Sequence, residues 1–126
     1  MSNTGQSIND LEIYREAMRL AETVWDLVAH WDFFAKDTVG KQWVRAVDSI
    51  ASNLSEGHGR YHFKENRMFC YYARGSLSET QTWLEKADRR SLIEADPARQ
   101  LYHDFETLRK RLNAYIHSIG DMSHGA

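Results

Sequence analysis

The sequence contains little proline, little glycine and little cysteine. Among 126 residues there are seven glycines, one proline (Pro97) and one cysteine (Cys70). Gly40 and Gly75 are the only glycines that lie inside segments with helical periodicity, and no segment alternates apolar and polar residues between regularly spaced turns. Because β proteins need both the alternation and the turns, the sequence predicts an all-α fold.

A single cysteine excludes a disulfide within the chain. Cys70 falls in an apolar helical stripe, which is typical of a packed core thiol. No run approaches the roughly 18 apolar residues of a membrane-spanning helix, and residues 1–10 lack the charged-then-apolar pattern of a signal peptide. We therefore expect a protein without a membrane partner that is located in the cytoplasm.

Charge is also modest, because the net charge is −2 with neutral histidines and 27% of residues are charged. Such a balance does not indicate a nucleic-acid or anionic-membrane partner for the chain as a whole, although a local basic patch is compatible with it. The length fits one domain, spanning residues 1–126, with an ordinary 42% share of hydrophobic residues.

Four segments have helical periodicity, and they predict helices at about 10–31, 38–56, 63–91 and 97–119. The predicted start signals are a capping box formed by Asn9 and Glu12, an N-cap at Asp37, and an N-cap at Asp96 followed by Pro97. Short connections between four helices predict an antiparallel up-down-up-down four-helix bundle.

The apolar stripes differ among these helices. The fourth helix has one seam with alternating spacings of three and four, as in a left-handed bundle. The seam consists of Ala98, Leu101, Phe105, Leu108, Leu112, Tyr115 and Ile119. The first and third helices carry wider or doubled stripes, so each needs a second buried surface, which a homo-oligomer would supply. Gly57 is expected to end the second helix with a positive φ, and Gly120 to end the fourth.

The second helix carries an unusual polar row opposite its apolar stripe. The row consists of Arg45, Ser49, Ser52, Asn53 and Glu56. Serine and asparagine inside a helix are each less favourable than alanine, and the four in this segment (Ser49, Ser52, Asn53, Ser55) together cost about 2 kcal/mol. Short polar side chains let another backbone approach closely, so we interpret the row as a packed helix–helix or subunit contact. A ligand or nucleic-acid surface and a plain solvated face are the alternatives.

The third helix offers a matching set in Arg74, Gly75, Ser76 and Glu79. Glycine inside a helix costs about 1 kcal/mol relative to alanine, so Gly75 predicts a close approach of another backbone. Arg74 could form a charge-assisted bond with Glu56, and Glu79 could form one with Arg45.

The best local candidate for nucleic-acid contact is Arg60, Lys64 and Arg67, with Tyr61 and Phe63 interleaved. The basic residues are spaced i, i+4 and i+7, as on one helical face, and could contact phosphates. A solvated helix start is the alternative interpretation.

No combination of residues indicates an enzyme, a cofactor or a metal. His58 and His62 are separated by Gly59, and His103 lies two heptads from His117, which is too far for one ion. The Glu-x-x-His pairs of a di-iron bundle are absent from the sequence.

The second and third helices together resemble the four-helix-bundle proteins named for the 23S rRNA-intervening sequence. The second-helix pattern of that family resembles R-A-x-x-S-I-x-x-N-x-x-E-G-x-G-R, and the third-helix pattern resembles A-R-G-S-x-x-E. The matching residues are Arg45, Ala46, Ser49, Ile50, Asn53, Glu56, Gly57, Gly59, Arg60, Ala73, Arg74, Gly75, Ser76 and Glu79. The resemblance covers about residues 11–119.

The resemblance implies a homopentamer around a central channel. The accessory proteins of diversity-generating retroelements are similar in fold and assembly, and they bind nucleic acid through basic surfaces. We therefore expect a non-catalytic, homo-oligomeric helical-bundle scaffold or interaction protein, with five copies. The alternative is a nucleic-acid-binding accessory protein that acts through a basic patch on the oligomer.

Overall fold

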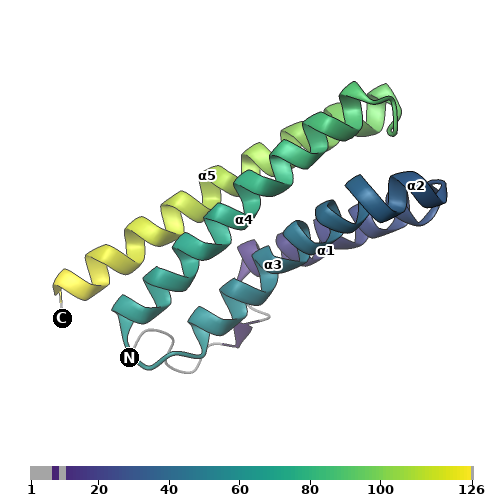
Figure 1. Cartoon of the computed structure of the whole chain (residues 1–126). Helices are drawn as coiled ribbons and strands as arrows, with labels where there is room; N and C mark the ends of the chain where they lie inside the picture. The colour runs from purple at the N-terminus through teal and green to yellow at the C-terminus, as the bar shows by residue number, and fades with distance from the viewer. Residues whose placement is uncertain (1–6, 9–10, 126) are drawn as a thin grey trace.

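The computed structural model describes residues 7, 8 and 11–125, with side chains as far as residue 120, and this part of the chain contains no strand. The elements are α1 (Glu12–Ala29), α2 (Phe33–Ala35), η2 (Lys36–Gly40), α3 (Lys41–His58), α4 (Phe63–Arg89) and α5 (Ala95–Gly125). The short α2 and the π-helical η2 lead into α3, so four long helical rods result. α3 folds back along α1, and α5 folds back along α4 (Figure 1). The predicted all-α class is confirmed.

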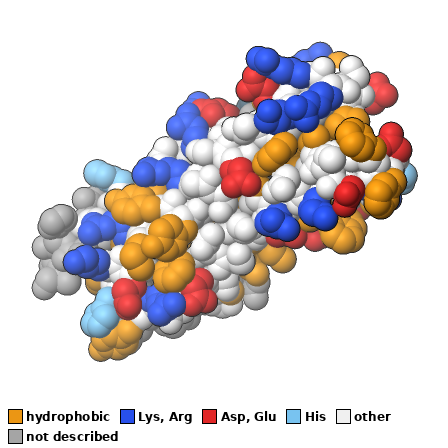
Figure 2. Space-filling view, in the orientation of Figure 1, with side chains coloured by type: hydrophobic (Ala, Val, Ile, Leu, Met, Phe, Trp, Pro, Cys, Tyr) orange, Lys and Arg blue, Asp and Glu red, His pale blue; other side chains and the backbone are white. Residues whose placement is uncertain are grey.

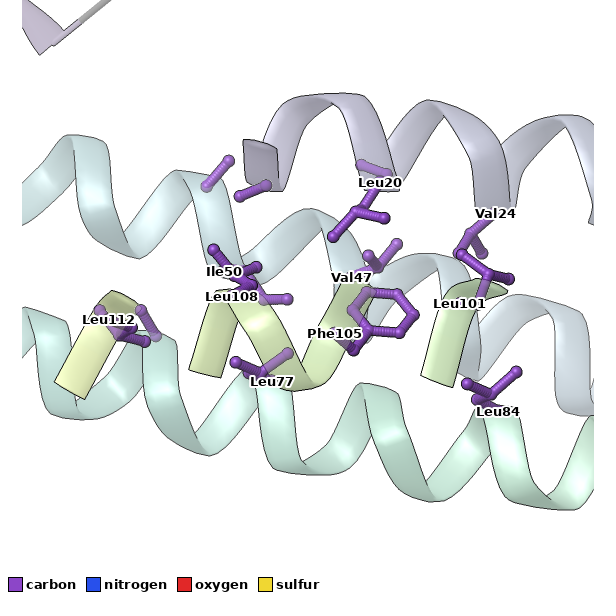
Figure 3. Close-up of a cluster of buried hydrophobic side chains, with 14 of the residues drawn as sticks. Leu20, Val24, Val47, Ile50, Leu77, Leu84, Leu101, Phe105, Leu108 and Leu112 are labelled. Carbon is purple, nitrogen blue, oxygen red and sulfur yellow. The ribbon is translucent and has the colours of Figure 1, made fainter. Parts of the chain in front are cut away.

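One hydrophobic core runs between the four rods, and every rod contributes to it (Figure 3). The fully buried members include Leu20 of α1, Ile50 of α3, Leu84 of α4 and Phe105 of α5. The predicted seam of the fourth helix is buried except at Tyr115, which is only partly buried because Ile116 occupies the core between Leu112 and Ile119. The alternation of three and four therefore identified the core face of α5 correctly.

The second rod begins earlier than predicted, because Asp32 and not Asp37 caps it. The Asp32 carboxylate accepts a hydrogen bond from the Ala35 N–H at 2.9 Å, which satisfies one of the unpaired donors of the first turn. Asp37 lies inside η2 and forms an ion pair with Lys41 at 3.2 Å. For the first rod, Asn9 lies outside the described residues, and Leu11 occupies the N-cap position without a side-chain cap.

Gly57 does not end α3 with a positive φ. The helix continues to His58, and Gly59 is the C-cap residue with a φ of −78°. Gly57 is buried, and a Cβ atom placed on it would lie 2.7 Å from Asn66 Oδ1 and 2.9 Å from Phe69 Cβ. The glycine is therefore explained by the close approach of α4 to α3, and not by a turn conformation.

The remaining helix ends also differ in detail from the prediction. α4 ends at Arg89, and Ser91 takes the left-handed conformation (φ 58°) that follows many helices, with Leu92 N–H donating to Ala87 O at 2.9 Å. α5 begins at Ala95, so Asp96 lies in its first turn rather than at the N-cap. α5 also continues through Gly120 to Gly125, because glycine lowers helix propensity without preventing helix.

Candidate subunit contact and nucleic-acid interface

The short polar side chains of the row on α3 form hydrogen bonds with backbone carbonyls of the same helix. Ser49 Oγ donates to Arg45 O at 2.8 Å, and Asn53 Nδ2 donates to Ser49 O at 2.9 Å. Ser52 Oγ donates to the same Ser49 carbonyl at 3.2 Å. The donors of these side chains are therefore satisfied within the helix, and the side chains lie close to the helix backbone.

The charged residues predicted to join α3 to α4 take other partners within the chain. Glu56 pairs with Arg60 at 2.6 Å, and Arg74 Nη1 donates to Asn113 Oδ1 on α5 at 3.0 Å. Arg74 is thus turned toward α5, so the predicted bond between Arg74 and Glu56 is not formed. The reason is register: Asn66 and Phe69 are the α4 residues that face this end of α3, and Arg74 lies more than one helical turn farther along α4.

Gly75 also differs from its prediction within the chain. It is exposed, and a Cβ atom built on it would meet nothing within 4 Å. Ser76 beside it is only half-buried. Arg45 and Glu79 are exposed, and no ion pair joins them in the described part of the chain. Within the described residues, nothing makes the close approach that Gly75 predicted.

Of the three residues predicted to contact nucleic acid, two line the same hollow and the third does not. Arg60 is paired with Glu56, and its guanidinium carbon lies 4.8 Å from the centre of the Phe69 ring. Lys64 and Arg67 instead line a hollow of about 320 Å³, together with Met68, Tyr71 and Glu65. Arg60 is therefore not part of the hollow that Lys64 and Arg67 line.

A second hollow adjoins the first one, and Arg67 and Tyr71 line both. Its volume is about 470 Å³, and Arg74 of α4 and His117 of α5 also line it. The Arg74 guanidinium carbon lies 5.0 Å from the centre of the Tyr71 ring, and Tyr71 is 45% exposed. Figure 2 shows Lys and Arg side chains beside hydrophobic ones at the end of the molecule where α4 begins.

We name this surface the basic groove and define it as Lys64, Arg67, Tyr71, Arg74 and His117. In such a surface the cations can contact phosphates, and the exposed aromatic ring can stack on a base. Tyr71 and His117 were not among the residues predicted from the sequence, and Arg74 was predicted to take part in another contact. The spacing of the α4 members (i, i+3, i+7, i+10) was a usable signal. No such signal existed for His117, because α5 lies beside α4 only in the folded chain.

Cys70 is fully buried, as the apolar stripe predicted. Burial raises the pKa of its thiol to about 12, so the thiol stays protonated at neutral pH and is a poor nucleophile. Among the described residues, no three His, Cys, Asp or Glu side chains are grouped closely enough to hold a metal ion. In the same residues, no helix combines the length and apolarity needed to cross a membrane.

Comparisons with known proteins agree with this architecture. A crystal structure of a protein of unknown function, from the S23 ribosomal protein family of Bacteroides thetaiotaomicron, superposes with a TM-score of 0.74. The two sequences are 20% identical, and the match covers 82% of this chain and 97% of that chain, so it supports the fold. No curated protein matches the sequence. The family model described as "23S rRNA-intervening sequence protein" matches residues 9–114. The chain therefore belongs to the 23S rRNA-intervening sequence protein family.

Proposed function

We propose that the protein is a non-catalytic scaffold that works as a homo-oligomer of up-down-up-down bundles, with five copies in a ring. The observation that carries the proposal is the open space in front of Gly75. A glycine inside a 27-residue helix costs about 1 kcal/mol relative to alanine, and no contact with the described part of the chain accounts for it. A backbone from a neighbouring copy would.

The low surface of α3 supports the same conclusion. Ser49, Ser52 and Asn53 bond to their own helix, so a neighbouring copy could approach without leaving these donors unpaired. Arg45 and Glu79 are exposed and would be able to pair with charges on that neighbour. In this proposal, the short polar residues of α3 and Gly75 of α4 act between copies, whereas Glu56 and Arg74 keep their partners within the chain.

Replacing Gly75 with leucine tests the ring. In the separate chain the leucine side chain has room, and its better helix propensity should raise the free energy of unfolding by about 1 kcal/mol. Between copies it would prevent close approach, so the mass measured by light scattering should fall from that of five copies toward that of smaller species.

Ala114→Leu is the matched control, because Ala114 is an exposed small residue on α5. This variant should keep the wild-type mass. A wild-type chain that is monomeric at about 100 μM, or a Gly75→Leu variant that keeps the ring, would contradict the proposal.

The basic groove favours a second function, which is nucleic-acid binding on the assembled ring. The carrying observation is that Arg67 and Tyr71 line both hollows, so cations and an exposed ring form one continuous surface. A weak site repeated on each copy would gain affinity through multivalency.

The double variant Lys64→Ala/Arg67→Ala tests this function. If the groove contacts phosphates, wild type should bind a fluorescein-labelled 20-nucleotide RNA, and affinity should fall steeply as salt rises. The double variant should weaken binding and reduce the slope of log K against log[salt] by about 2, one for each lost phosphate contact. Fluorescence anisotropy measures both quantities.

Arg89→Ala/Arg90→Ala removes the same charge from the opposite end of α4, where both residues are exposed. This control should bind like wild type. Equal weakening by both double variants would mean that general charge, and not the groove, governs binding. No binding at 20 mM salt would exclude the function.

A further inference from the structure

A shallow groove between α1 and α3 contains two hollows that lie apart from Gly75 and from the basic groove, although Arg45 and Ser52 of the polar row line them. The first, of about 410 Å³, has an apolar floor that includes Trp25 and Val44. The second, of about 360 Å³, includes Met18 and Ala51. Both large α1 side chains are exposed, Trp25 by 56% and Met18 by 43%. Exposed aromatic and methionine side chains in one concave strip are typical of a binding surface.

The close packing of α1 on η2 shapes the first hollow. A Cβ atom on Gly40 would lie 2.7 Å from Val28 Cγ1, so the two elements approach as closely as a glycine allows. Gly40 closes the π-helical turn η2, and such turns often occur at functional sites.

The charges of the groove are divided between its two ends. All the cations that line it belong to the first hollow, and they are Lys36, Lys41 and Arg45. Both lining carboxylates, Glu22 and Asp48, belong to the second. The two carboxylates lie close enough to repel, and burial together with Glu22 raises the pKa of Asp48. Of the three cations, Lys41 pairs with Asp37 at 3.2 Å, and among the described residues no ion pair joins Arg45 to Asp48, which lies one turn away on α3.

We infer that this groove binds the same groove of a second copy of the chain, with the cationic end of each on the acidic end of the other. Such a surface is self-complementary and forms a contact with two-fold symmetry. It does not depend on the contact proposed at Gly75, but the two contacts share Arg45, so they are distinguished in a chain whose ring contact is blocked.

The register of the two helices fits one two-fold axis. Val28 is level with Gly40, and Glu22 is close to Asp48, so the residue numbers fall along α1 as they rise along α3. The midpoint between Met18 and Trp25 is then level with the midpoint between Arg45 and Asp48.

We place the two-fold axis at that level, in the plane of the interface and perpendicular to the helices. It places Arg45 against the partner's Asp48 on α3, and it places Trp25 against the partner's Met18 on α1. One ion pair and one apolar pair therefore form twice, without any change in the fold. The partners of each pair lie at equal distances from the axis, about 2 Å along the helix for the ion pair and about 5 Å for the apolar pair.

The size of the strip predicts a weak contact. The helical segments that line it are about 16 residues long, or about 24 Å, and two helices are about 20 Å wide. A projected area on the order of 500 Å² per copy is below the roughly 800 Å² of a standard interface. Association should therefore be observed at tens to hundreds of micromolar.

Exchange of the two charges provides the test, carried out in the Gly75→Leu chain so that the ring does not interfere. Arg45→Glu alone places two carboxylates opposite each other twice, and Asp48→Arg alone does the same with two guanidiniums. Each should weaken dimerisation at least tenfold in sedimentation velocity at 1–500 μM. An equimolar mixture of the two variants restores both attractive pairs, so it should associate as tightly as the parent.

Two further variants complete the experiment. Trp25→Ala should weaken the dimer about tenfold, whereas Arg99→Glu, an exposed charge reversal on α5, should leave it unchanged. Far-UV circular dichroism confirms that each variant is helical. A parent that is monomeric at 500 μM would overturn the inference even if wild type forms a ring. A mixture that associates no better than its components would also overturn it.

Discussion

Replacing Phe105 with alanine is expected to lower the free energy of unfolding by about 3–5 kcal/mol. Phe105 is fully buried and is one of the largest such side chains in the protein. In the close-up of the core it lies among labelled side chains from all four long helices (Figure 3). Truncation removes the transfer energy of the ring and leaves a cavity that four rigid helices cannot collapse around.

Urea unfolding followed by circular dichroism measures this loss. Domains of this kind are stable by about 5–15 kcal/mol, so the variant should unfold at a much lower urea concentration or fail to fold at 37 °C. Phe34→Ala is the matched control, because Phe34 is 77% exposed and its truncation should change stability by less than about 0.5 kcal/mol. Similar losses in both variants would show that Phe105 is not central to the core.

Replacing Gly57 with alanine is the second large effect, with an expected loss of about 1–3 kcal/mol. Asn66 is 1% exposed, so its side chain cannot simply move away from the new methyl group. Phe69 Cβ and the Asn66 carbonyl, at 2.9 and 3.0 Å, belong to or adjoin the α4 backbone. The helices α3 and α4 would have to separate near the turn that joins them.

Gly59→Ala gives a control only two residues away. The nearest atoms to a Cβ at this position are 3.7 Å distant, and the φ of −78° suits any residue. This variant should be as stable as wild type, or slightly more stable because alanine restricts the unfolded chain. If Gly57→Ala is equally harmless in thermal unfolding, then the close approach of α3 and α4 is more adaptable than the packed contact implies.

Much of the fold follows from hydrophobic period alone. The seam that contains Phe105 was predicted because burial of one helix face requires apolar residues at spacings of three and four. Helix ends were harder, since Asp32 and Asp37 are both good capping residues and only the packing of the Phe33–Gly40 segment decides between them. Gly57 was assigned to a turn because a glycine near a helix end is usually there for its φ.

The candidate surfaces were predicted less completely. The polar row on α3 was recognised from helix propensity, which is a local property. The partner of Arg74 was not, because Asn113 is distant in sequence and approaches only when α5 packs on α4. Position along a helix therefore indicates which residues share a face, but not which of two neighbouring helices that face will meet.

The packing of each long helix against its neighbour along the chain has a consequence for the entropy of folding. The most extensive contacts join α1 to α3, α3 to α4 and α4 to α5, which are neighbours along the chain. Each pair is connected by a short segment, so closing it restricts few residues and loses little chain entropy. A protein with such local contacts reaches its native state without bringing distant segments together first, and it presents its outer surfaces for association soon after synthesis.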